Sequence, residues 1–366
     1  MGSFIIHESR LVVTSVPAPS SSAIIHQQHS EFDRVLKSRW KEVADSAVCF
    51  YRLDRLQNKV IAGKYGFVAQ YNPEKSKPGW RRPAQNFQKV NPNFDVKQFN
   101  FNQVTEREVV MGPEELPAVE EDETDTFLLI NISPIEFGSC LLVPRMTQNI
   151  PQLITLHGLQ VLLSTVLLST DPRLKAGFSS AGGCASVNHQ HYHVYYLEEQ
   201  LYLETAPVER IAGPCFAVTD YPAKGFAFQL DNNDPAQLAR HVFTLADYMR
   251  QNEMAHNMFI TRGRGFDVKR PGLSADADVH YGKIYETLRV FLWAREPAFG
   301  VKKDYGSMNP ALCEMGGHLL TTDKSEYEAM TEEAVSNILQ DMTSSWFQRV
   351  LPKIPLLFHD TFQDSS

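Results

Sequence analysis

Residues 177–197 read GFSSAGGCASVNHQHYHVYYL, and this stretch says most about the fold and the chemistry. Its second half places His189, His191 and His193 at alternate positions among aromatic and β-branched neighbours. Side chains at i, i+2 and i+4 share one face of a strand at spacings of about 6.5–7 Å, whereas a helix would scatter them. The spacing therefore predicts a strand that presents three imidazoles to one cavity.

The first half of the stretch is small and polar, and it predicts a loop that accepts an anion. Gly182 and Gly183 let the backbone approach a ligand closely, and Ser179 and Ser186 add hydroxyl groups. A neutral imidazole is a good nucleophile near neutral pH and a good leaving group from phosphorus. The loop and the histidine ladder together predict attack on phosphorus, with a further ladder histidine moving a proton to the departing oxygen.

Other interpretations of the ladder remain open. Strand histidines at i and i+2 also suit zinc, with Cys184, Cys313 or Glu314 as further ligands. Metal binding ranks second, because no cysteine or carboxylate stands at regular ligand spacing. Cys184 as a nucleophile ranks lower, since packing as a small buried side chain is its default role. A purely structural ladder ranks last, because burying three imidazoles without a function is costly.

Composition excludes several classes of function. The chain has 366 residues, 43% of them apolar, which fits one large or two closely packed globular domains. A net charge of -8 disfavours nucleic-acid binding, which needs a basic field. Five scattered cysteines without a CxxC pair argue against a disulfide framework, and no apolar stretch is long enough to span a membrane. We therefore expect a cytoplasmic protein without a nucleic-acid or membrane partner.

Hairpin and helix patterns alternate along the chain without a βαβ rhythm, which predicts an α+β fold. Residues 1–30 are rich in Ser, Pro, Gln and His, and we expect them to form a disordered tail. Strands are expected at 49–53, 59–70, 127–132, 139–144 and 208–228. Helices are expected at 31–47, 151–169, 235–253, 278–295 and 325–348.

The chain resembles the GDP-hexose phosphorylases, a branch of the histidine-triad superfamily near galactose-1-phosphate uridylyltransferase. Besides residues 177–197, the blocks at 63–70, 99–101, 131–138 and 309–318 carry the resemblance in colinear order. It covers about residues 35–350. The resemblance implies a histidine-triad-like antiparallel sheet with packed helices as a catalytic domain over 31–206. A C-terminal α+β domain over 207–366 would then complete the nucleotide pocket.

The resemblance also implies a chemistry. In the superfamily the middle histidine is the nucleophile, which maps onto His191. Plant members acting on GDP-L-galactose typically have Gln at the third ladder position, whereas His193 matches the animal-type members acting on GDP-D-glucose. The implied substrates are GDP-D-glucose and inorganic phosphate, with GMP held on His191 and without a metal or other cofactor. A hydrolase using the same histidine, and a metal- or nucleotide-binding protein without turnover, remain as alternatives. The oligomeric state is open, with a homodimer as one candidate.

Three further residues are candidates for substrate contacts. Lys64 and His318 fall in blocks that resemble the family, while Asn188 precedes the ladder and suits a ligand contact or a structural hydrogen bond equally well. Ser139 stands where many small histidine-triad proteins have a fourth histidine. The partner that fixes the ladder tautomer is therefore either a neighbouring backbone carbonyl or His189.

Overall fold

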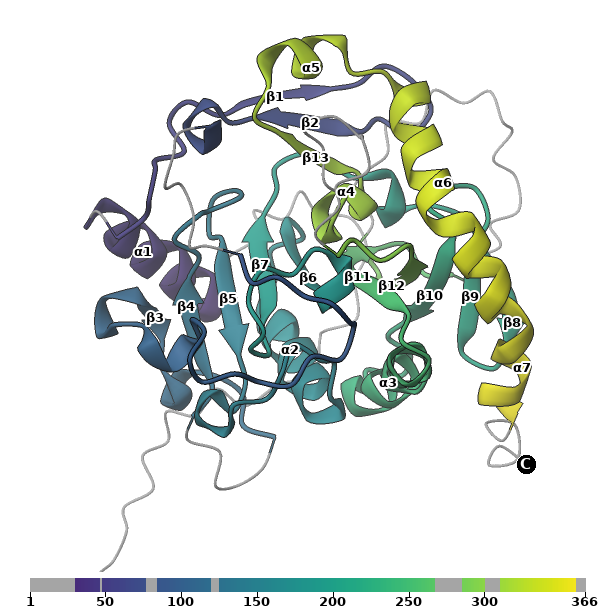
Figure 1. Cartoon of the computed structure of the whole chain (residues 1–366), viewed down its shortest axis with the longest axis horizontal. Coiled ribbons are helices and arrows are strands. Elements are labelled where there is room, and N and C mark those ends of the chain that lie inside the picture. The colour runs from purple at the N-terminus through teal and green to yellow at the C-terminus, as the bar shows by residue number, and fades with distance from the viewer. Residues whose placement is uncertain are drawn as a thin grey trace, which may run out of the picture.

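The computed structural model describes residues 30–46, 48–76, 84–119, 125–266, 285–299 and 310–359. Residues 1–29 of the expected tail lie outside the described residues. Helices pack around two sheets, so the predicted α+β class is confirmed (Figure 1).

The larger sheet has ten strands in the order β3-β4-β5-β7-β6-β11-β12-β10-β9-β8, and all neighbours are antiparallel. Its strands are β3 (Val109–Met111), β4 (Phe127–Ile130), β5 (Cys140–Val143), β6 (Leu174–Ser179), β7 (Tyr192–Tyr196), β8 (Val208–Ala212), β9 (Cys215–Val218), β10 (Gly225–Gln229), β11 (Ala255–Gly263) and β12 (Thr287–Arg295). The sheet is continuous through both halves of the chain, because β6 pairs with β11. The domain boundary between residues 206 and 207 stays a prediction.

The smaller sheet contains β1 (Gln57–Val60), β2 (Val68–Tyr71) and β13 (His318–Thr321). β1 and β2 form the hairpin that the sequence predicts, and Gly66 supplies a positive φ of 51° in its turn. β13 comes from the other end of the chain and pairs with β2 in parallel, so that His318 lies opposite Val68. This sheet lies at the top of the molecule in Figure 1.

Side-chain caps begin most of the longer helices. Ser30, Thr155, Asp234 and Thr331 each accept a hydrogen bond from a backbone N–H in the first turn, which satisfies one of the unpaired donors there. The helices are α1 (Glu31–Asp45), α2 (Leu156–Leu168), α3 (Pro235–Gln251), α4 (Leu312–Gly316), α5 (Lys324–Ala329), α6 (Glu332–Val350) and α7 (Ile354–Leu357). No helix in the described parts of the chain combines the length and apolarity needed to cross a membrane.

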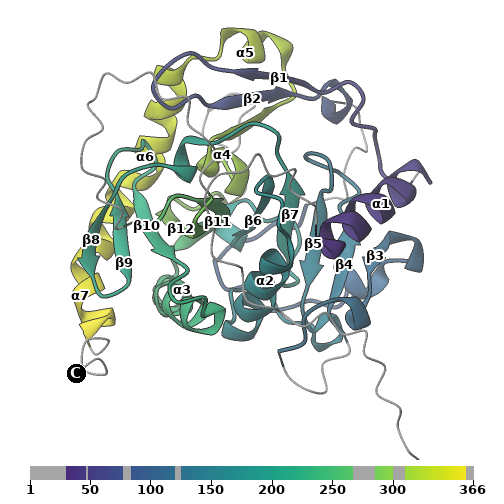
Figure 2. The same cartoon turned by 180° about the vertical axis from the view of Figure 1, so that it is seen from behind.

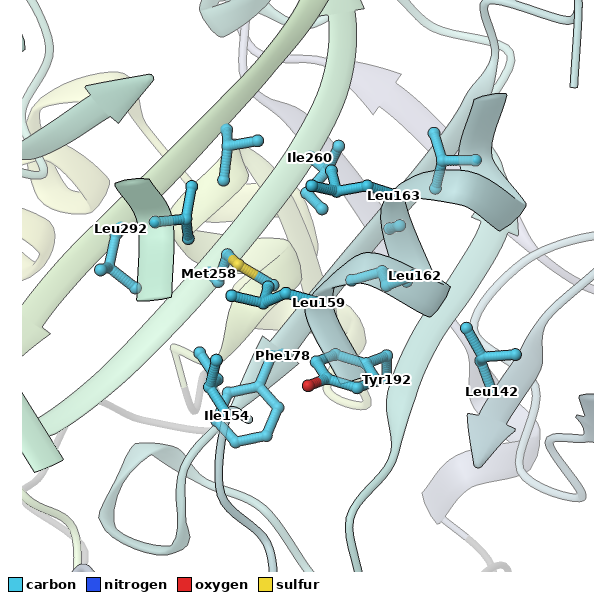
Figure 3. Close-up of a cluster of buried hydrophobic side chains, with 14 of the residues drawn as sticks. Leu142, Ile154, Leu159, Leu162, Leu163, Phe178, Tyr192, Met258, Ile260 and Leu292 are labelled. Carbon is cyan, nitrogen blue, oxygen red and sulfur yellow. The ribbon is translucent and has the colours of Figure 1, made fainter. Parts of the chain in front are cut away.

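One face of the large sheet packs against α2 and α3, which lie side by side (Figure 2). Leu159, Leu162 and Leu163 of α2 are fully buried there against Met258 and Phe178 (Figure 3). Burying each leucine contributes about 1.5–3 kcal/mol to folding.

The other face of the large sheet packs against the small sheet, α4 and α6. Tyr192, Val194 and Tyr196 of β7 belong to the α2 side, whereas Tyr195 belongs to this second layer. Because side chains alternate along a strand, His193 also points to the second layer. The fold therefore brings the ladder towards elements from both ends of the chain.

Four expected elements differ in the structure. The helix expected at 325–348 is two helices, α5 and α6, separated at residues 330 and 331. Residues 49–53 form an irregular segment, held by the Phe50 N–H donating to the Ile132 carbonyl and by the Tyr51 hydroxyl donating to the Pro134 carbonyl. Of the helix expected at 278–295, residues 287–295 are the strand β12, and residues 278–284 lie outside the described residues. The helix expected from residue 151 begins only at Leu156, after the Thr155 cap.

Candidate active site

The ladder lies at the start of β7, and only His193 lies within the strand. The backbone N–H groups just before the strand bond to residues 150–152 instead of to a strand. The Gln190 N–H donates to the Ile150 carbonyl at 2.8 Å, and the His191 N–H donates to Gln152 Oε1 at 2.9 Å. The predicted strand over all three histidines is therefore too long, because the 150–152 segment replaces a neighbouring strand there.

His191 is held in one tautomer by the backbone. Its Nδ1 lies 2.7 Å from the His189 carbonyl oxygen. A carbonyl can only accept, so we assign the ring proton to Nδ1, which leaves a lone pair on Nε2. The side chain is 4% exposed, and burial lowers the pKa of His191 to about 4. The imidazole is consequently neutral at pH 7, as a nitrogen nucleophile must be.

Aromatic rings flank His191 on two sides. The rings of His193 and Phe101 have their centroids 5.3 Å and 5.2 Å from that of His191. His189 instead packs against Phe94 and Phe101, and its Nδ1 accepts the Phe101 N–H at 3.0 Å. The structure thus pairs the rings of His191 and His193, whereas His189 serves His191 through its carbonyl group.

Two buried amides hold the ladder and the glycine-rich loop together. Gln152 is 1% exposed, and its Nε2 donates to the carbonyls of Ser179 at 3.0 Å and His191 at 3.2 Å. Asn257 is fully buried, and its Nδ2 donates to Ser179 Oγ and to the Gly183 carbonyl, both at 2.8 Å. Neither amide stands out in the sequence, because both are distant from the ladder in the chain.

The glycine-rich loop packs closely against the start of β11. A Cβ atom on Gly183 would lie 2.6 Å from the His256 carbonyl oxygen, and one on Gly182 would lie 2.9 Å from Ala255 Cβ. Larger residues would therefore push the loop away from β11. The Ser186 carbonyl accepts the Gln85 N–H at 2.9 Å, which attaches the end of the loop to a distant segment.

The remaining predicted contact residues lie in three different settings. Asn188 is 5% exposed, and its side chain accepts the Gln152 N–H at 2.9 Å and donates to the Asn93 carbonyl at 2.8 Å. Lys64 forms an ion pair with Asp220 at the surface. His318 is fully buried, with its Nδ1 3.5 Å from the Tyr195 hydroxyl. Of these three, His318 comes to the face of β7 that carries His193.

Within the described ranges, no three His, Cys, Asp or Glu side chains are grouped so as to hold a metal ion. A cavity of about 550 Å³ lies beside α1, lined by residues that include Trp40, Tyr51 and Phe137. The ladder histidines do not line that cavity, so it is separate from the site described here.

Four buried histidines and the half-buried His193 predict a loss of stability in acid. Burial lowers the pKa of His189, His191 and His256 to about 4, and that of His193 and His318 to about 3. The unfolded chain, with ordinary values near 6.5, binds more protons below that pH, so stability is complete above about pH 6.5 and falls towards pH 4. We expect the urea midpoint to be clearly lower at pH 5 than at pH 7.5. Equal midpoints would contradict the burial of neutral imidazoles.

Comparison with known proteins places this chain in a family. Residues 31–195 match the model of the GDPGP1-like N-terminal domain, and residues 202–354 match that of the GDPGP1-like C-terminal domain. The chain is 37% identical to GDP-D-glucose phosphorylase 1 of Danio rerio, over 85% of this chain and 86% of the relative. It is 38% identical to the protein of that name from Homo sapiens, over 85% and 79%. GDP-L-galactose phosphorylase 2 of Arabidopsis thaliana is 27% identical over 84% and 71%.

A solved structure shares the fold at low sequence identity. Yeast Ap4A phosphorylase Apa2 in complex with Ap4A matches with a TM-score of 0.57 and 13% identity, over 85% of this chain and 97% of that chain. Both family models and the relatives extend over most of the sequence. The chain therefore belongs to the GDPGP1-like family, as its ladder and its glycine-rich loop suggest.

Proposed function

We propose that the chain is a GDP-D-glucose phosphorylase, which converts GDP-D-glucose and inorganic phosphate to GDP and glucose 1-phosphate. The observation that carries the proposal is the 2.7 Å contact between His191 Nδ1 and the His189 carbonyl, which leaves Nε2 of this buried, neutral imidazole as the nucleophile. The relatives named GDP-D-glucose phosphorylase 1 support the choice of substrate.

In the first half-reaction, His191 Nε2 attacks the α-phosphorus of GDP-D-glucose. The new N–P bond forms as the bond from that phosphorus to the bridging oxygen breaks, and glucose 1-phosphate leaves with the bridging oxygen. The ring becomes a cation when Nε2 is substituted, and the His189 carbonyl dipole stabilises that charge. His193, beside His191, is placed to donate a hydrogen bond or proton to the departing oxygen.

In the second half-reaction, an oxygen of inorganic phosphate attacks the same phosphorus. The N–P bond breaks, GDP forms and neutral His191 is restored. We propose that Ser179, Gly182, Gly183 and Ser186 form the phosphate side of the pocket, with Asn188, Lys64 and His318 as further candidate contacts. A cytoplasmic location and a homodimer also stay proposals.

A product assay with and without inorganic phosphate tests this function. GDP, and glucose 1-phosphate beyond one equivalent per protein, should appear only when phosphate is present. GMP appearing equally with and without phosphate would leave His191 as the nucleophile but make the protein a hydrolase. No product from any GDP-hexose would favour the alternative of a binding protein without turnover.

Gln152→Met should slow catalysis without unfolding the protein. Methionine has a similar length but cannot bond the His191 N–H or the two carbonyls that Gln152 now joins. Because small displacements of a nucleophile are costly, we expect kcat to fall about 10–100-fold while KM for GDP-D-glucose changes little. Steady-state kinetics and a thermal melt would measure this. The control is Gln103→Met at an exposed position, and a normal kcat in folded Gln152→Met would refute the positioning role.

A further inference from the structure

Asn257, Ser179 and His191 come side by side across three neighbouring segments of the fold. Asn257 of β11 is the register partner of Ser179, the last residue of β6. β6 also pairs antiparallel with β7, where Gly177 lies opposite His193. Two residues farther along each segment, Ser179 therefore comes opposite His191, just before β7 begins. Ser179 thus lies between Asn257 and the residue that we propose as the nucleophile.

The amide of Gln152 bridges the backbones of Ser179 and His191. Its Nε2 donates to the Ser179 carbonyl at 3.0 Å and to the His191 carbonyl at 3.2 Å, and its Oε1 accepts the His191 N–H at 2.9 Å. Because one nitrogen bonds both carbonyls, the two backbones are adjacent although β6 and β7 no longer pair there. The strand register and these hydrogen bonds agree that Ser179 is next to the nucleophile.

The side chains of Ser179 and Asn257 lie on the face of the large sheet opposite to α2. Phe178 and Met258, their neighbours in sequence, belong to the core on the α2 side (Figure 3). Because side chains alternate along a strand, Ser179 and Asn257 point to the other face. The Ser179 hydroxyl is therefore on the same side of the sheet as His193, the proposed proton donor to the leaving group.

Hydrogen bonds fix the orientation of the Asn257 amide. Its Nδ2 donates to Ser179 Oγ and to the Gly183 carbonyl, both at 2.8 Å, and its Oδ1 accepts Arg295 Nη1 at 3.3 Å. A guanidinium only donates and a carbonyl only accepts, so the flipped amide would lose both bonds. Arg295 is 2% exposed, and its Nη1 also donates to the Pro310 carbonyl. The group beside Ser179 Oγ is therefore a donor.

This donor determines where the Ser179 hydroxyl can send its own proton. A serine hydroxyl has one proton and two lone pairs, and the Asn257 amide occupies one lone pair. The proton must then point away from Asn257. Among the residues that the structure describes, it has no acceptor, although Ser179 is only 4% exposed. The hydroxyl is thus an available donor next to the nucleophile, and it suits a ligand oxygen that only accepts.

We propose that the Ser179 hydroxyl donates a hydrogen bond to a non-bridging oxygen of the phosphorus that His191 attacks, and that Asn257, held by Arg295, is the positioning residue that directs this proton. This inference rests on the proposed function. The non-bridging oxygens of that phosphorus carry negative charge and no proton, so they accept hydrogen bonds only. They stay on the GMP group in both half-reactions, and Ser179 keeps its proton throughout.

A donor that is already aimed at these oxygens lowers the barrier to transfer. It costs no reorganisation when charge redistributes around phosphorus in the transition state, because Asn257 holds the proton in place beforehand. Asn257 itself does not touch the substrate and acts only through Ser179. Its effect on catalysis should therefore exist only while the Ser179 hydroxyl is present.

The test compares Ser179→Ala, Asn257→Asp and the double variant with the wild-type protein. Asn257→Asp puts an acceptor beside Ser179 Oγ, so that the hydroxyl proton turns away from the substrate. We expect each single variant to lower kcat, and the rate of GMP transfer to the protein without phosphate, by about 100-fold, the loss typical of one transition-state donor. KM for GDP-D-glucose should change little. Because both changes remove the same hydrogen bond, the double variant should be no slower than Ser179→Ala.

Asn252→Asp is the matched control. It makes the same chemical change just before β11, at an exposed position where the amide donates to the Tyr248 carbonyl at 2.8 Å. Its kinetics should be those of the wild type, and thermal melts show whether each variant is folded. Ser179→Ala removes a single oxygen atom, so this variant decides the question even if Asn257→Asp does not fold.

Two results would overturn the inference while the wild-type protein turns over normally. One is a normal kcat in either folded single variant. The other is a double variant whose loss equals the product of the two single losses, since Asn257 would then act independently of Ser179. Wild-type protein that gains no GMP group and releases no GDP would instead overturn the proposed function.

Discussion

Replacing His191 with alanine is expected to abolish turnover and leave the fold intact. The variant loses the imidazole ring whose tautomer the His189 carbonyl sets. It therefore loses Nε2, the nitrogen that attacks phosphorus. Removing a nucleophile that acts through a covalent intermediate typically lowers kcat by about 10⁴-fold or more. The side chain ends next to His193 and Phe101 rather than in the leucine-rich core, so the loss of stability should be modest.

Mass spectrometry and kinetics together measure this prediction. Wild-type protein incubated with GDP-D-glucose without phosphate should gain the mass of one GMP group, and His191→Ala should gain none. The control is His241→Ala in α3, which removes a histidine from another part of the molecule and should keep full activity. Substantial activity in folded His191→Ala protein would refute the covalent mechanism.

Replacing Lys175 with methionine should destabilise the protein more than any other single change proposed here. Lys175 in β6 and Glu204 are both 1% exposed, and Lys175 Nζ lies 2.8 Å from Glu204 Oε1. The ammonium group also donates to the Pro172 carbonyl and to Thr261 Oγ1, both at 3.0 Å. The variant leaves the Glu204 carboxylate buried without its ion-pair partner, which typically costs about 3–5 kcal/mol.

Urea unfolding of single and double variants would measure that cost. Lys175→Met with Glu204→Leu should recover a large part of the lost free energy of unfolding, because no single charge then stays buried. Lys324→Met is the control, since the Lys324–Glu328 pair is exposed and should contribute less than about 1 kcal/mol. Full stability in Lys175→Met would show that the pair is not important for folding.

Local patterns predicted the elements whose signals lie within a few residues. The helix at α1, the hairpin of β4 and β5 and the helix at α3 all have caps, turns or clear spacing. The sequence predicts a helix where β12 lies, because both faces of this strand are buried and a continuous apolar run has no two-residue alternation. The layers that cover both faces of the sheet come from distant parts of the chain, which explains the error.

The candidate site also contains some residues that the sequence identifies and others that only the structure reveals. The residues of the ladder and of the glycine-rich loop stand out in the sequence, because the chemistry requires them at close spacing. Gln152 and Asn257 do not stand out, since each is an ordinary polar residue that the fold brings to the ladder or its loop from a distant segment. The tautomer-fixing partner of His191 was one of two predicted options, and the backbone geometry at His189 decides between them.

The pairing of β6 with β11 also affects how the chain folds during synthesis. β6 ends at Ser179, but its partner β11 begins only at Ala255. At about 5–20 residues per second, the ribosome needs roughly 4–15 s to make the intervening chain. During this time the hydrogen-bonding edge of β6 next to the future site has no partner, and such an edge pairs readily with other chains. A nascent chain stopped in this interval should therefore aggregate or bind chaperones, whereas the full-length chain closes its own edge.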